Sequence, residues 1–363
     1  MPTVALDVTP LLGQRTGIGV AVAGFVEHLA GRPDLDLVGY GLTARAWRSV
    51  GDHLPAGVRA RSRPAPARLL LDAWRRWDWP PAGYWSGRAD LVHGTNFVVP
   101  PTGRSRAMVS VWDLTAVHRP ELCTPTSRLY PELVARALGR GAWVHTASRY
   151  VAGEIAVHFG IDRDRIKVVP PGVRPARPAR PASGRPPYVL ALGRTEPRKD
   201  LPTLIRSFEL LAASLPDLEL CIAGPPGWAE DQVLRAAAAS PFADRIRRVG
   251  WVDDPAGLLA GAAVFAYPSL YEGFGLPPLE AMASGVPVVA TAVGSIPETV
   301  GSAAELVSPG DAESMAAALR RVLEDGGRRA ELVRAGLERA GSYSWPAAAE
   351  ALYRAYVEVI GAG

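Results

Sequence analysis

The sequence predicts an α/β protein built from two doubly wound parallel-sheet domains. Its 363 residues exceed the size of one ordinary hydrophobic core and fit two domains of common size. Short apolar segments alternate with helical segments along almost the whole chain, a pattern typical of parallel sheets with helices on both faces. Residues 174–187 interrupt it with closely spaced prolines, and this stretch predicts a stiff connector between the domains.

Before the connector, residues 1–173 are expected to form an N-terminal domain. An apolar strand over 3–8 (TVALDV) leads into a helix over 17–30 (GIGVAVAGFVEHLA). Further strands are expected in DLVHGT and AMVSVWDL. Ser148 is placed to cap the N-terminus of a helix in SRYVAGEIAVHFG.

After the connector, residues 188–343 repeat the alternation and are expected to form a second domain. Strands are expected at YVLALG, LELCIAG and PVVATAVG and at the end of GLLAGAAVFAYPS, and helices at LPTLIRSFELLAAS and PPLEAMASG. Ligands bind sheets of this kind at the carboxyl ends of the strands. With two such domains, the expected site is the cleft between them.

Composition and cysteine content exclude several classes of protein. Hydrophobic residues make up 48% of the chain and charged residues 21%, and no apolar run is long enough to span a bilayer, so a soluble globular protein is expected. The first residues, MPTVALDVTP, lack the basic and apolar regions of a secretion signal. Cys123 and Cys221 stand far apart without a CxxC or a Cys/His cluster. We therefore expect a reducing cytoplasm, and neither a disulfide framework nor a zinc site.

The net charge is +4, and much of the positive charge lies in residues 59–81 and 174–187. In the first stretch tryptophans are interleaved with arginines, namely Trp74, Trp77 and Trp79 with Arg68, Arg75 and Arg76. Two interpretations are open: a solvated arginine- and proline-rich loop, or a surface that contacts an anionic membrane or an acidic acceptor. No nucleic-acid-binding motif accompanies the charge, so nucleic acid is not expected as a partner.

Two segments suit a phosphate-bearing ligand. Gly17 and Gly19 come just before the first predicted helix, where backbone N–H groups and the helix dipole favour an anion, although a plain tight turn fits equally well. Val22 stands where a dinucleotide fingerprint requires glycine. Arg194 and Lys199 follow the strand YVLALG. Two fixed cations at a strand end suit a diphosphate, and two exposed surface cations are the alternative.

The segment YEGFGLPPLE, residues 271–280, carries two acids in an otherwise apolar region. Gly273 and Gly275 allow backbone amides to approach a ligand closely, and Glu272 can accept hydrogen bonds from sugar hydroxyls. The double proline favours a helix start, with Glu280 in the first turn, where a carboxylate can hold a ribose diol. A glycosidase acid pair is the alternative, but it would need no cationic diphosphate seat. Together these segments predict a nucleotide-sugar site.

A series of motifs resembles the retaining glycosyltransferases of family 4, which have the GT-B fold: TGIG, SRYVAGEIAVHFGI, VVPPGV, LGRTEPRKDLPTLI, PSLYEGFGLPPLEAMASGVPVVA, GSIPETVG and SYSW. The resemblance covers nearly the whole chain. It implies two Rossmann-like domains that face each other across a cleft, the first for the acceptor and the second for the nucleotide-sugar donor. It also implies that a terminal helix, within residues 344–363, packs back on the first domain.

The resemblance also implies roles for individual residues. Arg194 and Lys199 would bind the donor diphosphate, Glu272 would contact the transferred sugar, and these three are the expected catalytic residues. Glu280 would hold the ribose. The rest of the donor site would be the backbone after Glu272 and two glycines on the opposite wall, namely Gly273, Phe274, Gly275, Leu276, Gly17 and Gly19.

The chain departs from many relatives at Trp112-Asp113, where they have histidine before the aspartate. An indole cannot replace the acid/base chemistry of histidine. In a front-face retaining transfer, which the family implies, the leaving diphosphate takes the acceptor proton, so Trp112 is expected to shape the sugar pocket. Asp113 is expected to orient a loop or cap a helix. Three histidines are candidates for the cleft, each with a plain structural alternative: His93, His118 and His145.

A metal ion is not expected. The two DxD matches, residues 34–36 and 162–164, fall in a predicted connection and a helix start rather than after a strand. The two cations of the predicted diphosphate seat can supply the positive charge that a divalent ion supplies elsewhere.

The expected function is metal-independent transfer of a hexose to a glycan, lipid-linked or small-molecule acceptor, with mannose from GDP-mannose as the first choice. A non-catalytic nucleotide-sugar binding subunit and a GT-B nucleotide-sugar epimerase are the alternatives. The expected location is the cytoplasm, with peripheral contact at the inner face of the membrane if the acceptor is a lipid.

Overall fold

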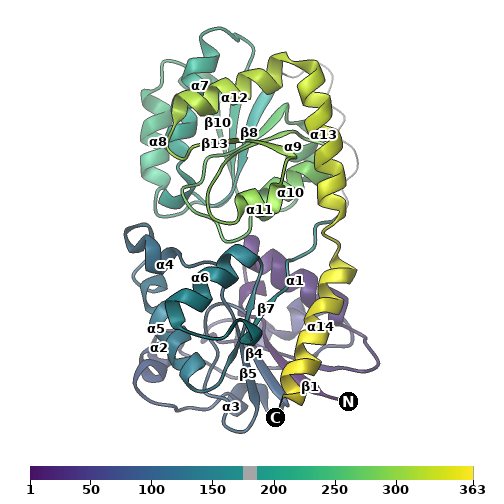
Figure 1. Cartoon of the computed structure of the whole chain (residues 1–363). Helices are drawn as coiled ribbons and strands as arrows, with labels where there is room; N and C mark the ends of the chain where they lie inside the picture. Colours follow the sequence, from purple (N-terminus) through teal and green to yellow (C-terminus); the bar gives the residue numbers. More distant parts are fainter. Residues whose placement is uncertain (175–185, 363) are drawn as a thin grey trace. The chain divides into compact units, whose positions relative to one another are not determined.

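The structure, a computed structural model, describes residues 1–174 and 186–362 and divides into two compact units (Figure 1). Met1–Gly172 and Trp345–Gly363 form the first unit, and Val173–Ser344 form the second. Most of the connector expected over 174–187 lies outside the described residues. Each unit has its own parallel sheet flanked by helices, and the predicted α/β fold class is confirmed.

The first sheet has seven strands in the order β3-β2-β1-β4-β5-β6-β7, and neighbouring strands pair in parallel. In chain order they are β1 (Thr3–Asp7), β2 (Asp36–Tyr40), β3 (Arg59–Arg61), β4 (Leu91–Gly94), β5 (Arg106–Ser110), β6 (Trp143–Thr146) and β7 (Ile166–Val168). The central strands are apolar and buried on both faces, which is why they appear as continuous apolar runs in the sequence.

Helices cover both faces of this sheet. One group shares a hydrophobic cluster with the strands, namely α2 (Ala67–Arg76), α5 (Tyr130–Gly139) and α6 (Arg149–Phe159). Ser148 caps α6, as predicted, because its side chain accepts the N–H of Val151 at 3.2 Å. Helix α1 (Gly17–Leu29) packs against the C-terminal helix. Two one-turn helices complete the unit, α3 (Gly83–Ser86) and α4 (Thr115–His118).

The C-terminal helix α14 (Trp345–Gly361) belongs to the first unit, although it follows the second unit in sequence. The Trp345 ring occupies space left by Gly24 of α1, where an added Cβ would come within 2.2 Å of the ring. Farther along α14, the Tyr356 hydroxyl lies 2.7 Å from Nδ1 of buried His93. These contacts fix the helix on the first sheet, and the predicted return of the terminal helix is confirmed.

The second sheet has six strands in the order β10-β9-β8-β11-β12-β13, again paired in parallel. In chain order they are β8 (Tyr188–Leu192), β9 (Glu219–Ala223), β10 (Ile246–Gly250), β11 (Val264–Tyr267), β12 (Val288–Thr291) and β13 (Ala304–Val307). Its helices are α7 (Leu201–Ala212), α8 (Glu230–Ala239), α9 (Ala256–Gly261), α10 (Leu276–Ala283), α11 (Ile296–Val300), α12 (Ala312–Glu324) and α13 (Gly326–Gly341). None of the helices described in either unit is both long and apolar enough to cross a bilayer.

The arginine- and tryptophan-rich stretch, residues 59–81, is not a loop throughout. The interpretation as a solvated loop is wrong for the two parts of it that form a strand and a helix. Arg59–Arg61 form β3, and Ala67–Arg76 form α2. Trp74 is 2% exposed and its indole N–H donates to the carbonyl of Pro80 at 3.0 Å, so it is a core residue. Leu70 and Trp74, four positions apart, face the core while arginines occupy the outer face.

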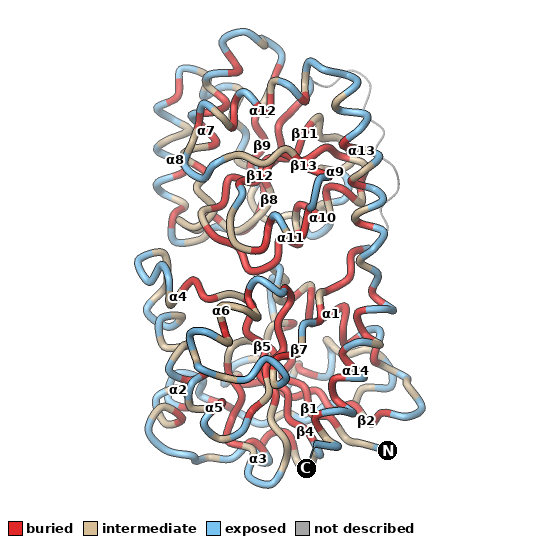
Figure 2. Tube along the Cα trace, in the orientation of Figure 1, coloured by how far each residue is buried: buried red, intermediate tan, exposed pale blue. Residues whose placement is uncertain are grey.

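Each sheet reverses its strand order once, between β1 and β4 in the first and between β8 and β11 in the second. Ligands of open α/β sheets bind at the carboxyl edge of such a reversal. Buried residues run along the strands up to these edges (Figure 2). Polar side chains at the edges are therefore candidates for binding a ligand or for holding the loops in place.

Candidate functional site

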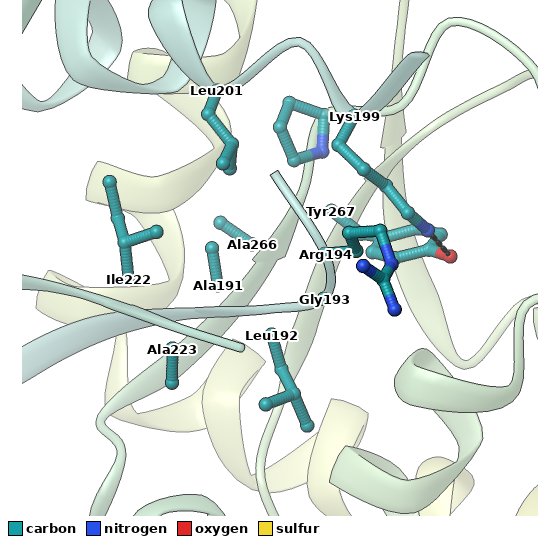
Figure 3. Close-up of a pocket in the computed structure, with 11 residues that line it drawn as sticks. Ala191, Leu192, Gly193, Arg194, Lys199, Leu201, Ile222, Ala223, Ala266 and Tyr267 are labelled. Carbon is teal, nitrogen blue, oxygen red and sulfur yellow. Dashed lines mark hydrogen bonds between the residues drawn. The ribbon is translucent and has the colours of Figure 1, made fainter. Parts of the chain in front are cut away.

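A small pocket lies at the reversal point of the second sheet (Figure 3). Its walls come from the carboxyl ends of β8, β9 and β11, and Gly193 forms part of its lining. Arg194 and Lys199, which the sequence predicts as a diphosphate seat, both line it. The strand order and the predicted cations therefore indicate the same place.

Lys199 is held at this pocket by two neighbours. It ends a 3-10 turn, Pro197–Lys199, that follows β8. Its ammonium lies 2.6 Å from Oε1 of Glu272 and donates to the Tyr267 hydroxyl at 2.7 Å, a bond drawn in Figure 3. The side chain is 12% exposed. Burial lowers the pKa of Lys199, and the adjacent Glu272 carboxylate opposes that shift.

Glu272 is tied to two cations rather than one. Its Oε2 lies 2.7 Å from Nη1 of Arg198, and its Oε1 also accepts the Ser269 hydroxyl at 2.7 Å. Burial alone would raise the pKa of Glu272, but Arg198 and Lys199 lower it to about 2. Glu272 is therefore an ionised, buried carboxylate at neutral pH.

Arg198 is a member of this cluster that the sequence interpretation missed. Besides Glu272, it contacts the carbonyl of Tyr271 at 2.9 Å and Oε2 of Glu196 at 3.3 Å. It therefore links the turn after β8 to the segment after β11. The sequence EPRKD shows that Arg198 directly precedes Lys199. This adjacency does not predict that the Arg198 side chain points toward Glu272 rather than into solvent.

Arg194 is the more accessible cation of the predicted pair, with 34% of its side chain exposed. Nη1 donates to the carbonyl of Pro226 at 3.2 Å, and Nε lies 3.8 Å from Glu196. The loop that carries Pro226 is fixed by Thr195, whose hydroxyl accepts the N–H of Gly227 at 2.7 Å. Arg194 thus stands beside a fixed loop, with its side chain partly exposed to solvent.

The backbone after Glu272 is closely packed in its predicted place. Gly275 has φ of +100° and directly precedes α10, which begins at Leu276. An added Cβ at Gly275 would lie 2.6 Å from the Ile296 side chain, so glycine is required there. Phe274 is 8% exposed, with its ring packed against Tyr343. The Phe274 side chain is therefore occupied by packing within the unit.

Glu280 lies just beyond the first turn of its helix, one residue later than predicted. It is the fifth residue of α10, and the first turn of that helix contains no acid. The prediction failed because the helix begins at Leu276, before the double proline rather than at it. Glu280 is half-buried, and burial raises its pKa to about 7 although Arg174 opposes the shift.

Gly17 and Gly19 lie in the first turn of the first helix, within the range expected for it over 17–30 and not ahead of it. Helix α1 begins at Gly17, and Thr16 is its N-cap. An added Cβ at Gly19 would approach the carbonyl of Pro10 to 2.7 Å, whereas one at Gly17 would meet open space. Close packing against the preceding loop thus explains Gly19 without a ligand.

Trp112 and its neighbours follow β5 in the first unit. Trp112 is 8% exposed and its indole N–H donates to the carbonyl of Thr95 at 2.8 Å. Asp113 accepts the N–H of Thr115, the first residue of α4, at 2.9 Å. His118 lies on the surface, 3.0 Å from the carboxylate of Glu154.

His93 and His145 do not line an open edge and belong to a buried chain of hydrogen bonds inside the first unit. Oγ of Ser110 lies 2.8 Å from a ring nitrogen of each, and Nε2 of His145 lies 3.0 Å from the carbonyl of Val169. Burial lowers the pKa of His145 to about 4 and that of His93 well below its usual value. Both are neutral core histidines, because their strand-end positions are covered by α1 and α14.

The described residues contain no group of three His, Cys, Asp or Glu side chains arranged to hold a metal ion. Of the two DxD matches, Asp34 pairs with Arg32, and Asp36 forms an ion pair with Arg59 at the start of β2 rather than in a connection.

Two family descriptions match this chain, one for each half. Residues 15–177 match glycosyltransferase family 4, and residues 174–339 match glycosyl transferases group 1. The O-antigen chain mannosyltransferase B of Escherichia coli is 31% identical over 297 residues, which are 76% of this chain and 77% of that protein. The D-inositol 3-phosphate glycosyltransferase of Thermobispora bispora is 30% identical over 77% of this chain and 73% of its own length. The phosphatidyl-myo-inositol mannosyltransferase of Mycolicibacterium smegmatis is 38% identical over a shorter region, 50% of this chain and 47% of its own.

Solved structures show the same fold at low identity. A sucrose-phosphate synthase from Thermosynechococcus elongatus superposes with a TM-score of 0.77 over 100% of both chains at 19% identity. WaaG, a glycosyltransferase involved in lipopolysaccharide biosynthesis, gives 0.75 over 99% of this chain and 100% of its own at 16% identity. The motifs, the two parallel sheets and these relatives agree: the chain is a glycosyltransferase of family 4, group 1, with the GT-B fold.

Proposed function

We propose that the protein is a retaining hexosyltransferase that transfers mannose from GDP-mannose to a glycan, lipid-linked or small-molecule acceptor. The observation that carries this is the cluster of Lys199, Arg198 and Glu272 at the reversal point of the second sheet. Mannose is favoured because two similar relatives are named as mannosyltransferases. The acceptor-binding edge would then belong to the first unit.

In this proposal the second unit binds the nucleotide sugar. Lys199 and Arg194 bind the diphosphate, backbone amides of residues 273–276 and the Glu272 carboxylate orient the sugar, and Glu280 accepts hydrogen bonds from the ribose hydroxyls. The bond between the anomeric carbon and the phosphate oxygen breaks, and a bond from that carbon to the acceptor oxygen forms on the same face. The acceptor proton passes to the departing phosphate, whose negative charge the two cations stabilise. No enzyme nucleophile or metal ion is needed.

A direct test follows the anomer that is formed. The protein is incubated with GDP-α-mannose, or with UDP-α-glucose, in EDTA, and the released sugar is followed by proton NMR before mutarotation. We expect hydrolysis of GDP-mannose with α-mannose formed first. First formation of the β-anomer would contradict retention, and loss of all turnover in EDTA would contradict metal independence.

The binding-subunit alternative predicts a different pattern. A donor would stabilise the protein against heat, but it would turn over neither alone nor with an added polyol or glycan. The alternative rests on Trp112, which stands where many relatives have histidine. The Trp112 N–H donates to the carbonyl of Thr95, so the indole has a structural role that is compatible with catalysis.

Nucleotide binding is expected to release a proton from Glu280. Its pKa of about 7 exceeds the ordinary value of 4.5, so below pH 7 the free protein holds this proton and its ionised form is disfavoured. Ribose hydroxyls that donate to the carboxylate favour the ionised form and lower the pKa. Affinity for GDP should therefore rise as pH increases from 5 to 7. Calorimetry in buffers of different ionisation enthalpy should show the release, and Glu280→Gln should abolish it; an equal release in that variant would exclude this role.

We also propose that the first unit contacts an anionic membrane. Beside the buried face of α2, three large apolar side chains are exposed, Leu69 at 69%, Trp77 at 61% and Trp79 at 71%. Arg68 and Arg76 are exposed on the same helix. Exposed tryptophan beside arginine suits the interface of a membrane with negatively charged lipids.

Vesicle sedimentation tests this contact. We expect binding to phosphatidylglycerol vesicles and not to phosphatidylcholine vesicles, weakened about tenfold or more by the double change Trp77→Ser and Trp79→Ser. Trp228→Ser is the matched control, because Trp228 is an exposed tryptophan of the second unit at 49%. Equal loss in the control, or no lipid preference, would contradict the proposal.

A further inference from the structure

We infer that the carboxyl edge of the first sheet binds an acceptor hydroxyl group through the Asp7 carboxylate and the Tyr40 hydroxyl. This inference rests on the proposed function, because it assigns a residue pair to the acceptor that the reaction requires. Neither residue stood out in the sequence, where Asp7 is one acid at the end of an apolar strand.

The position is the counterpart of the pocket in the second unit. Asp7 ends β1, at the point where the strand order of the first sheet reverses between β1 and β4. Tyr40 ends β2 and pairs directly with Asp7 in the parallel register, so the two side chains extend from the same face of the sheet. Across the reversal, Thr95 after β4 donates its hydroxyl to the carbonyl of Asp7 at 2.6 Å.

Asp7 has an acceptor atom to spare. It is 3% exposed, and its Oδ1 accepts both the N–H and the hydroxyl of Thr9, at 2.9 and 2.5 Å. Oδ2 accepts no hydrogen bond from the residues described, and no lysine or arginine among them forms an ion pair with Asp7. Burial raises the pKa of Asp7 to about 6, although the bonds from Thr9 oppose the shift.

Tyr40 supplies the second, independent sign of a missing partner. It is fully buried, and its hydroxyl makes no hydrogen bond with any described residue. A buried hydroxyl without a partner destabilises the free protein. The nearby Asp7 charge adds to the effect of burial in raising the pKa of Tyr40, so the two groups lie in one electrostatic environment.

Aromatic residues lie near Asp7, whose charge adds to burial in raising the pKa of Tyr130. Phe97, just after β4, has φ of +60°, a strained conformation for a bulky residue. Its ring stacks on Tyr130 with centroids 5.0 Å apart and planes 7° from parallel. Trp112 fixes this segment through its bond to the Thr95 carbonyl. An unbonded carboxylate oxygen and a buried hydroxyl without a partner, both near aromatic rings, are features of a polar ligand site.

The chemistry selects a neutral hydroxyl as the ligand. A carboxylate oxygen accepts from a ligand O–H, and a tyrosine hydroxyl can donate to the oxygen of that same ligand group, so a hydroxyl has the chemistry that both Asp7 and Tyr40 can bind. A phosphate would be repelled by Asp7. A metal ion would need further ligands, and the described residues provide no such cluster. The acceptor class is therefore a polyol or sugar presenting a free hydroxyl.

The test compares water with added hydroxyl acceptors in the same enzyme. Donor hydrolysis is measured without acceptor and with 1 M glycerol or methyl α-D-mannopyranoside, and glycoside formation is quantified. We expect Asp7→Asn to lower kcat/KM for the acceptor about tenfold or more, and Tyr40→Phe to lower it about threefold, with hydrolysis in water nearly unchanged. Tyr40→Phe should not lower the Tm, because the hydroxyl it removes has no partner in the free protein.

Tyr356→Phe is the matched control, because the Tyr356 hydroxyl is also buried but is bonded to His93. It should lower the Tm and leave acceptor kinetics unchanged. Unchanged acceptor kinetics in both edge variants would overturn the inference, as would equal loss of hydrolysis and transfer. Hydrolysis by the wild type that neither acceptor accelerates would also overturn it. Absence of any donor turnover in the wild type would instead contradict the proposed function.

Discussion

Replacing Lys199 with alanine is expected to weaken binding of GDP about 10- to 150-fold. The change removes a charge-assisted contact to the diphosphate worth roughly 1.5–3 kcal/mol. It also removes a cation 2.6 Å from Glu272, leaving Arg198 as the nearby positive partner of that buried carboxylate. Calorimetric titration of GDP in EDTA measures the effect directly.

The chain offers a precise control for this variant. It contains two lysines in all, Lys167 and Lys199. Lys167 lies in the first unit and forms an ion pair with Glu358, with 16% of its side chain exposed. Lys167→Ala should bind GDP like the wild type. Unchanged affinity in Lys199→Ala, with the fold intact, would show that the diphosphate seat is elsewhere.

Replacing Glu272 with glutamine should damage transfer more than nucleotide binding. Glutamine keeps one acceptor oxygen but loses the charge that holds Lys199 and Arg198 and receives the sugar hydroxyls, so kcat/KM should fall roughly 10- to 100-fold. The freed cations remain available to the diphosphate, and the Kd for GDP should stay within about threefold. Steady-state transfer and calorimetry on the same preparation separate the two effects.

Glu305 provides the matched control, because it is also a poorly exposed carboxylate held by two arginines, Arg321 and Arg328. Glu305→Gln should lower the Tm, as Glu272→Gln should, but leave transfer unchanged. If transfer and GDP affinity fell equally in Glu272→Gln, Glu272 would be a structural residue of the pocket and not a sugar ligand.

The sequence was sufficient for the fold and for one half of the candidate site. Alternating apolar runs predict two parallel sheets because strands buried on both faces cannot carry polar residues. Lys199 and Glu272 could be singled out because charges at strand ends are exceptional in such a pattern. Their mutual contact, 2.6 Å across 73 positions, could not be read from spacing, because the strand order of the sheet decides it.

Other features depend on packing that no local pattern reveals. His145 stands near a strand end, but side chains from α1 enclose it. The prolines predict the start of the helix that carries Glu280 one residue too late, because the start depends on Gly275 at positive φ. The sequence does not single out Asp7, because the proposed role rests on an unbonded carboxylate oxygen and on the hydroxyl of Tyr40, which has no partner among the described residues. A missing hydrogen-bond partner can be recognised only when the positions of all surrounding residues are known.

We propose that the donor diphosphate binds at the carboxyl edge of the second sheet. A crystal structure of the protein with GDP, grown in EDTA, tests it most directly. We expect a diphosphate oxygen within hydrogen-bond distance of Nζ of Lys199, a second near the guanidinium of Arg194, and the ribose hydroxyls at Glu280. If the diphosphate were bound away from Lys199, with the Lys199–Glu272 contact undisturbed, the diphosphate site would not be the carboxyl edge of the second sheet.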